Sequence, residues 1–232
     1  MFKILFLFAV IGAVAPQRSA FVDYILDLQY AVGFIHDYIQ DTTWQSRYDM
    51  SDELTVTIEG AVTEITTGLT NFLTIRNRIE NYVTEHRNTT SNQACVDEAV
   101  AGWSNLQTSV GATISACGTQ HLETIHGNVQ GYHDFVNSHR NVKFDAQNIV
   151  LSTLTTVNTM TNFPELTPAV EQGINEAYDF YEEEVHPGIQ SRLNEFGNLR
   201  TGIPTQVHDC VAGALNNFDS DAMLMLQAVR AC

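Results

Sequence analysis

The stretch "CVDEAVAGWSNLQTSVGATISAC" occupies residues 95–117, and "CVAGALNNFDSDAMLMLQAVRAC" occupies residues 210–232. Both open with Cys-Val, close with Ala-Cys and hold their two cysteines at the same spacing. Apolar residues recur in each at steps of three or four, which is the period of an amphipathic helix. The sequence therefore predicts two helices that each carry a cysteine near both ends.

Helix geometry restricts how these cysteines can pair. An unbroken helix over 95–117 would place its sulfurs about 33 Å apart, whereas a disulfide needs Cα atoms within about 7 Å. Pairing inside each stretch therefore requires a break, for which residues 103–105 and 216–221 are candidates. Because the apolar period continues through both, we favour two continuous helices lying side by side in opposite directions, joined by Cys95–Cys232 and Cys117–Cys210. Pairing within each stretch and a parallel arrangement are the alternatives.

A second similarity lies upstream of each cysteine stretch. "ELTVTIEGAVTEI" at residues 53–65 resembles "ELTPAVEQGINEA" at residues 165–177, and the offset between matched positions stays between 112 and 115 residues. Collinear matches of this kind predict a tandem duplication, with one repeat at residues 21–127 and the other at residues 128–232.

Helical periodicity extends over nearly the whole chain, and no alternating strand pattern stands out. The expected fold is all-α: an elongated helical bundle of two diverged tandem repeats, about three helices each, stapled by two disulfides. Pro168 suits the first turn of a helix, and Pro187 is expected to kink or divide one.

Residues 1–20, "MFKILFLFAVIGAVAPQRSA", have the layout of a secretory signal peptide, with Lys3 before a short apolar run. No later segment is apolar enough to span a membrane. We therefore expect a secreted, extracellular protein in which Cys95, Cys117, Cys210 and Cys232 are oxidised.

The charge balance excludes some partners. The net charge is −16, with 27 acidic and 11 basic residues, and removal of Lys3 and Arg18 makes it two units more negative. Such a surface repels nucleic acid.

"NTT" at Asn88 is an N-glycosylation sequon, which predicts a glycoprotein modified on a surface loop.

The cysteine spacing in "ACVDEAVAGWSNLQTSVGATISACGTQ" (residues 94–120), together with the signal peptide and the acidic helical composition, resembles the TsetseEP-type secreted proteins of insects. The chain departs from that family in having few cysteines and no Glu-Pro repeat tail. The resemblance implies an extracellular insect product of gut or another secretory epithelium. It carries over no catalytic residue.

No motif of this chain indicates catalysis, a metal or a cofactor. His121 and His126 are five residues apart and do not share a helix face, and "YEEEVHP" at residues 181–187 lacks the ordered ligand loop that calcium sites use. We therefore expect a solvated acidic helix end there and no enzymatic site.

The apolar stripes leave two functional hypotheses. They can bury one another as a core, or they can enclose a cavity for a hydrophobic small molecule or lipid. In the second case we expect an adaptable lining from Phe72, Trp103, Phe218, Met223 and Met225. The leading hypothesis is a secreted non-enzymatic binding protein, and the alternative is a structural factor with a protein partner.

Overall fold

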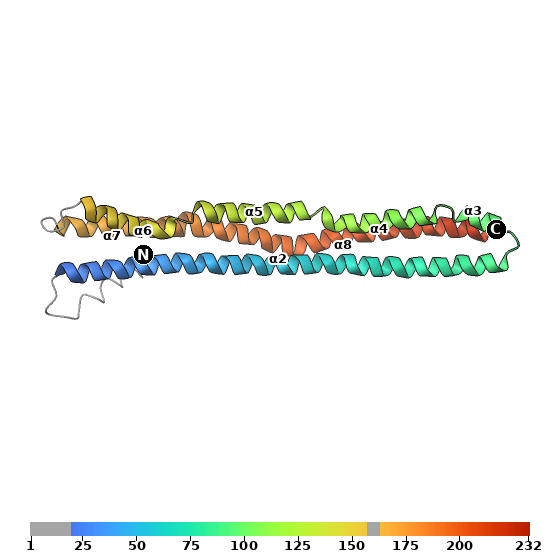
Figure 1. The fold of residues 1–232 in the computed structure, drawn as a ribbon, viewed down its shortest axis with the longest axis horizontal. Helices are drawn as coiled ribbons and strands as arrows, with labels where there is room; N and C mark the ends of the chain where they lie inside the picture. Colours follow the sequence, from blue (N-terminus) through green and yellow to red (C-terminus); the bar gives the residue numbers. More distant parts are fainter. Residues whose placement is uncertain (1–19, 157–162) are drawn as a thin grey trace. The chain divides into compact units, whose positions relative to one another are not determined.

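The computed structural model describes residues 20–156 and 163–232, and all its regular elements within these ranges are helical (Figure 1). They are α2 (Ala20–Thr89), α3 (Gln93–Ala99), α4 (Trp103–Thr119), α5 (Leu122–Ser138), α6 (Val142–Thr156), α7 (Phe163–Phe180), the π-helical turn η1 (Tyr181–Val185) and α8 (His186–Arg230). The all-α prediction is confirmed. The expected signal peptide, apart from Ala20, lies outside the described residues.

The helices divide into two compact units. Within the described residues, unit 1 comprises residues 20–49, 130–156 and 163–193, and unit 2 comprises residues 50–129 and 194–232. Each unit takes residues from both expected repeats, so units and repeats do not coincide. The duplication itself is a statement about ancestry and stays a prediction.

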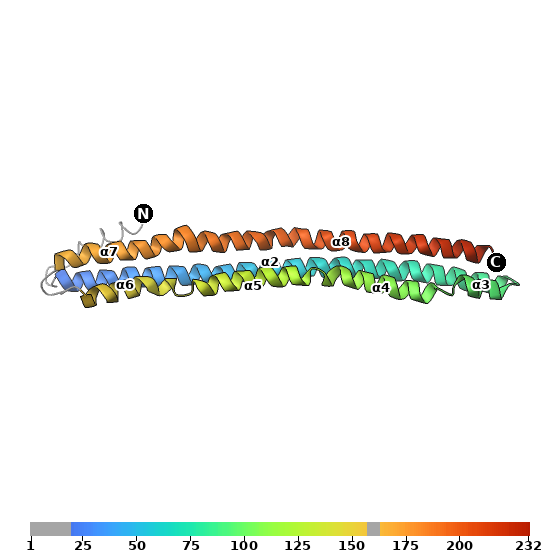
Figure 2. The ribbon, with the colours of Figure 1, turned by 90° about the horizontal axis from the view of Figure 1, so that it is seen from above.

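Unit 2 is an up–down–up arrangement of three helical segments. In α2 and α8, Glu64 lies beside His208, and a Cβ on Gly68 would come within 2.2 Å of Val211, so the two helices run in the same direction. The α4 segment runs the other way, because Gly118 lies against Ile65 whereas Gln107 donates to Glu80 over 2.8 Å. Figures 1 and 2 show the three segments side by side in both views.

The two disulfides join α8 to the α3–α4 segment with the predicted connectivity. Cys95 pairs with Cys232 and Cys117 with Cys210, at Cα–Cα distances of 5.6 and 5.7 Å. The segments are antiparallel, as the cysteine spacing favoured. Among the described residues, both bonds lie in unit 2.

The first cysteine stretch is not continuous, which corrects one expectation. Residues 100–102 separate α3 from α4, and the N–H groups of Ala101 and Trp103 donate to carbonyl groups only three residues earlier. Gly102 weakens the helix at this point. The second stretch runs through α8 to Arg230 without a break. The chain also turns at residues 90–92 before Cys95, whereas Cys210 lies inside α8.

Unit 1 has the same up–down–up order. On α2, His36 contacts Phe144 of α6 with ring centroids 5.5 Å apart, and Lys143 donates to Gln40 over 3.4 Å. Farther along the chain, Tyr38 donates to Glu182 of η1 over 2.8 Å. The segments of unit 1 are thereby joined by side-chain contacts between helices.

Of the two outcomes expected at Pro187, a kink or a division, the structure shows no division of the helix. The chain instead widens into the π-helical turn η1, in which the N–H of His186 donates to the carbonyl of Tyr181, five residues earlier. Because proline has no N–H and its ring clashes with the carbonyl four residues before it, the wider turn accommodates Pro187 and the helix continues as α8. Pro168 lies inside α7, in its second turn.

Removal of one disulfide is expected to destabilise unit 2. Closing a loop of 93 residues between Cys117 and Cys210 contributes about 3 to 5 kcal/mol through the lost entropy of the unfolded chain. Replacing both cysteines by alanine should lower the free energy of urea unfolding by about that amount. The two tryptophans give a reporter for each unit, since Trp103 lies in unit 2 and Trp44 in unit 1. With Trp44→Phe as background, Trp103 fluorescence should show the loss; an unchanged midpoint would contradict it.

Candidate functional site

The five residues expected to line a cavity lie in packed clusters or at the surface of unit 2. Phe72, Trp103 and Phe218 pack on one another in the core of unit 2, with the Phe218 ring centroid 5.0 Å from that of Phe72 and 5.4 Å from that of Trp103. Met225 packs at the edge of a smaller cluster, and Met223 is 48% exposed. Core packing accounts for the three aromatic residues, and the contacts give no support to a lining role.

The other predicted positions are at the surface. Asn88 is exposed in the last turn of α2 rather than on a loop. Glu182 accepts a hydrogen bond from Tyr38 and lies 3.8 Å from His186, while Glu183 and Glu184 are exposed.

In residues 20–156 and 163–232 no three His, Cys, Asp or Glu side chains are grouped to hold a metal ion. No helix in those ranges is long and apolar enough to cross a bilayer.

The candidate site is a pocket of about 200 Å³ in unit 1, between α2, the α5–α6 segment and the η1–α8 segment. Its floor consists of side chains that are each less than 6% exposed: Ile39, Val136, Tyr181, Val185 and Ile189. Two of them, Tyr181 and Val185, are the first and last residues of η1. The π-helical turn therefore supplies part of the floor, a placement in keeping with the frequent occurrence of such turns at functional sites.

The rim of this pocket carries basic and polar side chains. They are Gln40, Trp44 and Arg47 from α2 and His139, Arg140 and Lys143 from the end of α5 to the start of α6. Trp44 and Arg140 are exposed, so the pocket opens to solvent on that side. No Asp or Glu residue is among the described lining residues. We call this site the cationic pocket.

Hydroxyl groups hold the helices together behind the pocket floor. Tyr132 and Ser46 form a buried hydrogen bond of 2.6 Å, and the Tyr181 hydroxyl is hydrogen-bonded to Thr42. Burial is the main cause that raises the pKa of both tyrosines above the ordinary value of 10.0. It also raises the pKa of Tyr38, where the hydrogen bond to Glu182 adds to the effect.

A second hollow in unit 1 is apolar. It has a volume of about 260 Å³ between α2 and α6, and aliphatic side chains make most of its wall: Ile25, Leu28, Val32, Val150, Leu151 and Leu154. We call it the apolar groove. It lies on the same α2–α6 contact as the cationic pocket, toward the beginning of α2.

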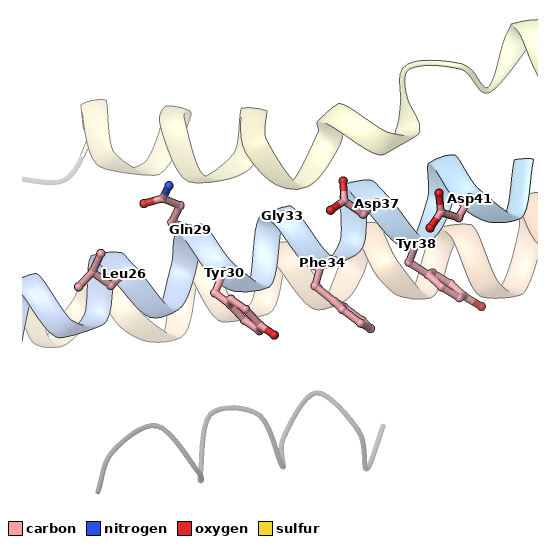
Figure 3. A pocket seen from close by; sticks show the side chains of 8 residues that line it. All are labelled: Leu26, Gln29, Tyr30, Gly33, Phe34, Asp37, Tyr38 and Asp41. Atoms are coloured by element: carbon pink, nitrogen blue, oxygen red, sulfur yellow. The ribbon is translucent and has the colours of Figure 1, made fainter. Parts of the chain in front are cut away.

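A third feature is a row of exposed rings on α2, which we call the aromatic face: Tyr30, Phe34, Trp44 and Tyr48. They are 45% to 66% exposed, and at 100° per residue they fall within about 80° of one another. Figure 3 shows Tyr30, Phe34 and Tyr38 extending from the same side of the helix, with Asp37 and Asp41 nearby.

The sequence interpretation missed all three features. The buried apolar stripe of α2 dominates its helical period, so the exposed rings on the other side of the helix did not enter the prediction. The cationic pocket did leave a sequence signal: Arg140 and Lys143 are three residues apart with no acidic residue between them, in a chain with only 11 basic residues. The contribution of Arg47 depends on the packing of α2 and could not be inferred.

Unit 1 should lose stability at alkaline pH. All five tyrosines with a raised pKa (Tyr24, Tyr38, Tyr132, Tyr178 and Tyr181) lie in it. A raised pKa in the folded state means a stabilising contribution that is complete below the unfolded pKa of 10.0 and lost as the pH rises above it.

Urea unfolding followed by Trp44 fluorescence, with Trp103→Phe as background, should therefore show a lower free energy of unfolding at pH 11 than at pH 8. Tyr132→Phe should reduce that difference, whereas Tyr82→Phe in unit 2 should not. Equal stabilities at the two pH values would refute the expectation.

Comparisons with known proteins give no family for this chain: no protein-family model, curated protein or solved structure matches it. The likeness to TsetseEP-type proteins accordingly remains a prediction from cysteine spacing and composition.

Proposed function

We propose that this chain is a secreted, non-enzymatic binding protein that holds a hydrophobic small molecule or lipid in unit 1. The observation that carries the proposal is the apolar groove. Leu28 and Val32 are buried at its base, whereas Leu151 on its wall is 61% exposed. Covering such a surface with an apolar ligand is favourable by about 25 cal/mol per Å² removed from water.

The location of the groove differs from the one expected from sequence. The expected lining belongs to unit 2, where its aromatic members already fill the core. The groove lies in unit 1, where the described residues form no disulfide. A unit without such cross-links can separate its helices more easily to admit a ligand, which supports placing the binding function there.

Secretion is part of the proposal. Two disulfides are compatible with an oxidising compartment, and the sequence of residues 1–20 supports export. The absence of a recognisable catalytic motif supports a binding role over an enzymatic one.

The aromatic face favours a second candidate function, a structural or protein-interaction role. Exposed tyrosine, tryptophan and phenylalanine side chains gather at protein interfaces more often than on the rest of a surface. Asp37 and Asp41 beside the rings of the aromatic face would favour a partner with basic residues next to an apolar surface.

An apolar fluorophore distinguishes these functions. Nile red should bind the purified protein, and Val150→Glu should weaken this binding about tenfold or more, because it places a charge in an apolar site. Val62→Glu is the matched control, since Val62 is 54% exposed on α2 in unit 2. Tyr30→Ser with Phe34→Ser should leave Nile red binding unchanged under the carrier function.

Solvent extraction of the natively purified protein, followed by mass spectrometry, should recover a hydrophobic compound in a fixed ratio to the chain. An empty protein that also fails to bind Nile red would refute the carrier function and leave the protein-interaction function.

A further inference from the structure

We infer that the cationic pocket binds the carboxylate of a small amphipathic anion, with Arg47, Arg140 and Lys143 facing the charge and the buried floor holding the apolar part. The inference goes beyond the proposed function, because it concerns a second site of unit 1 and adds the charge and the size of the ligand bound there.

The basic side chains of the described residues differ in whether they pair with other groups. Lys3 and Arg18 lie outside the described residues, which leaves nine of the 11 basic residues. Four of these form ion pairs with carboxylates: Arg76, Arg78, Arg87 and Arg200. Arg192 donates to two carbonyl oxygens, and Arg230 donates to the Tyr82 hydroxyl. The other three are the cations of the pocket, and within the described ranges none of them lies within 4.0 Å of an Asp or Glu oxygen.

This arrangement is unusual for so acidic a chain. With 27 acidic against 11 basic residues, carboxylates are abundant enough to pair with every cation. Three cations brought together from α2 and the α5–α6 segment, with no carboxylate among the lining residues, repel one another and create a local positive potential. An anionic ligand would relieve that repulsion.

Arg47 has a hydrogen-bond donor without a partner in the described part of the chain. The Nε–H of Arg47 is buried and has no hydrogen-bond acceptor among the described residues. The Arg47 guanidinium lies 5.5 Å from the ring centroid of Trp44, which holds it over the pocket rim. A planar guanidinium suits a carboxylate, which it can contact through two parallel hydrogen bonds. The Nε–H groups of Arg76 and Arg87 are also buried without an acceptor in the described ranges, so the position of Arg47 in the pocket distinguishes it from them.

His139 and Lys143 are oriented by their own contacts. His139 Nδ1 lies within hydrogen-bond distance of the Phe135 carbonyl, at 2.9 Å, which fixes the ring at the pocket rim. Lys143 is held by Gln40 over 3.4 Å and lies 5.0 Å from the ring centroid of Phe144. Neither contact neutralises the lysine charge, so Lys143 keeps it for a ligand.

The size of the pocket sets the length of the ligand. A volume of about 200 Å³ is below the roughly 300–1,000 Å³ of most small-molecule sites, which suits a carboxylate with a short alkyl chain. Ile39, Val136 and Ile189 of the floor are almost fully buried and provide an apolar surface without competing polar groups. Octanoate is the probe that fits this description.

Calorimetric titration should show that octanoate binds the full chain more tightly than 1-octanol, which has the same chain length without the charge. Octylammonium should not bind detectably. Arg47→Gln and Lys143→Gln should each weaken octanoate about tenfold or more, since a hydrogen bond to a charged group is among the stronger ones, and should leave 1-octanol unchanged. Raising the salt concentration should weaken octanoate alone.

Arg200→Gln is the control. Arg200 is paired with Glu53 over 3.3 Å in unit 2, and its replacement changes the net charge by the same amount as each pocket variant. It should leave octanoate binding intact. Unchanged circular dichroism and thermal unfolding of the pocket variants would establish that the loss of binding is local.

The outcomes separate the two proposals. Equal binding of octanoate and 1-octanol, with no effect of the pocket variants, overturns the anion site and leaves the carrier function standing. Binding that depends on the cations but is as tight for acetate as for octanoate keeps the anion site and overturns the role of the apolar floor, while Nile red binding to the apolar groove tests the carrier function separately. Failure of every probe to bind overturns both.

Discussion

The architecture of unit 2 depends on the two disulfides between α8 and the α3–α4 segment. Cys95 at the start of the α3–α4 segment joins Cys232 after the end of α8, and Cys117 near the end of that segment joins Cys210 in the middle of α8. Together they fix both the antiparallel direction and the register of these two segments. With this register Phe218 of α8 meets Trp103 of α4, and α2 packs against the linked pair through Phe72 and through its close approach to α8 at Gly68. The side chains that the sequence suggested for a ligand are therefore used to hold the helices together.

The helical period predicted most of this fold because the inward stripe is the strongest signal that a packed helix leaves in its sequence. Helix length and the continuous apolar period favoured the observed cysteine connectivity, but they left pairing within each stretch and a parallel arrangement open. The break at residues 100–102 and the turn η1 lie next to places that the sequence singled out, residues 103–105 and Pro187, but the form of each could not be predicted from the helical period. Gly102 and Pro187 mark these places, but the sequence does not show whether such a residue ends a helix or is absorbed by it.

The candidate site was less accessible to sequence reasoning than the fold. Arg47 and Lys143 are almost a hundred residues apart, and only the packing of α2 against α6 brings them to one pocket. The proposed anion site is also defined by the carboxylates that its described lining lacks. Most of the surface carries carboxylates, so three cations without a carboxylate beside them stand out among the described residues. No sequence motif describes such a lack of carboxylates.

The order in which the cysteines are synthesised gives the disulfides a further consequence. Cys95 and Cys117 are made before either of their partners, and Cys210 follows Cys117 by 93 residues, which takes about 5 to 20 seconds of translation. During that interval the two early thiols could only oxidise with each other. Once α3 and α4 form, their rise of about 1.5 Å per residue keeps these thiols far beyond bonding distance. In the folded chain the α3–α4 segment therefore keeps Cys95 and Cys117 from pairing with each other.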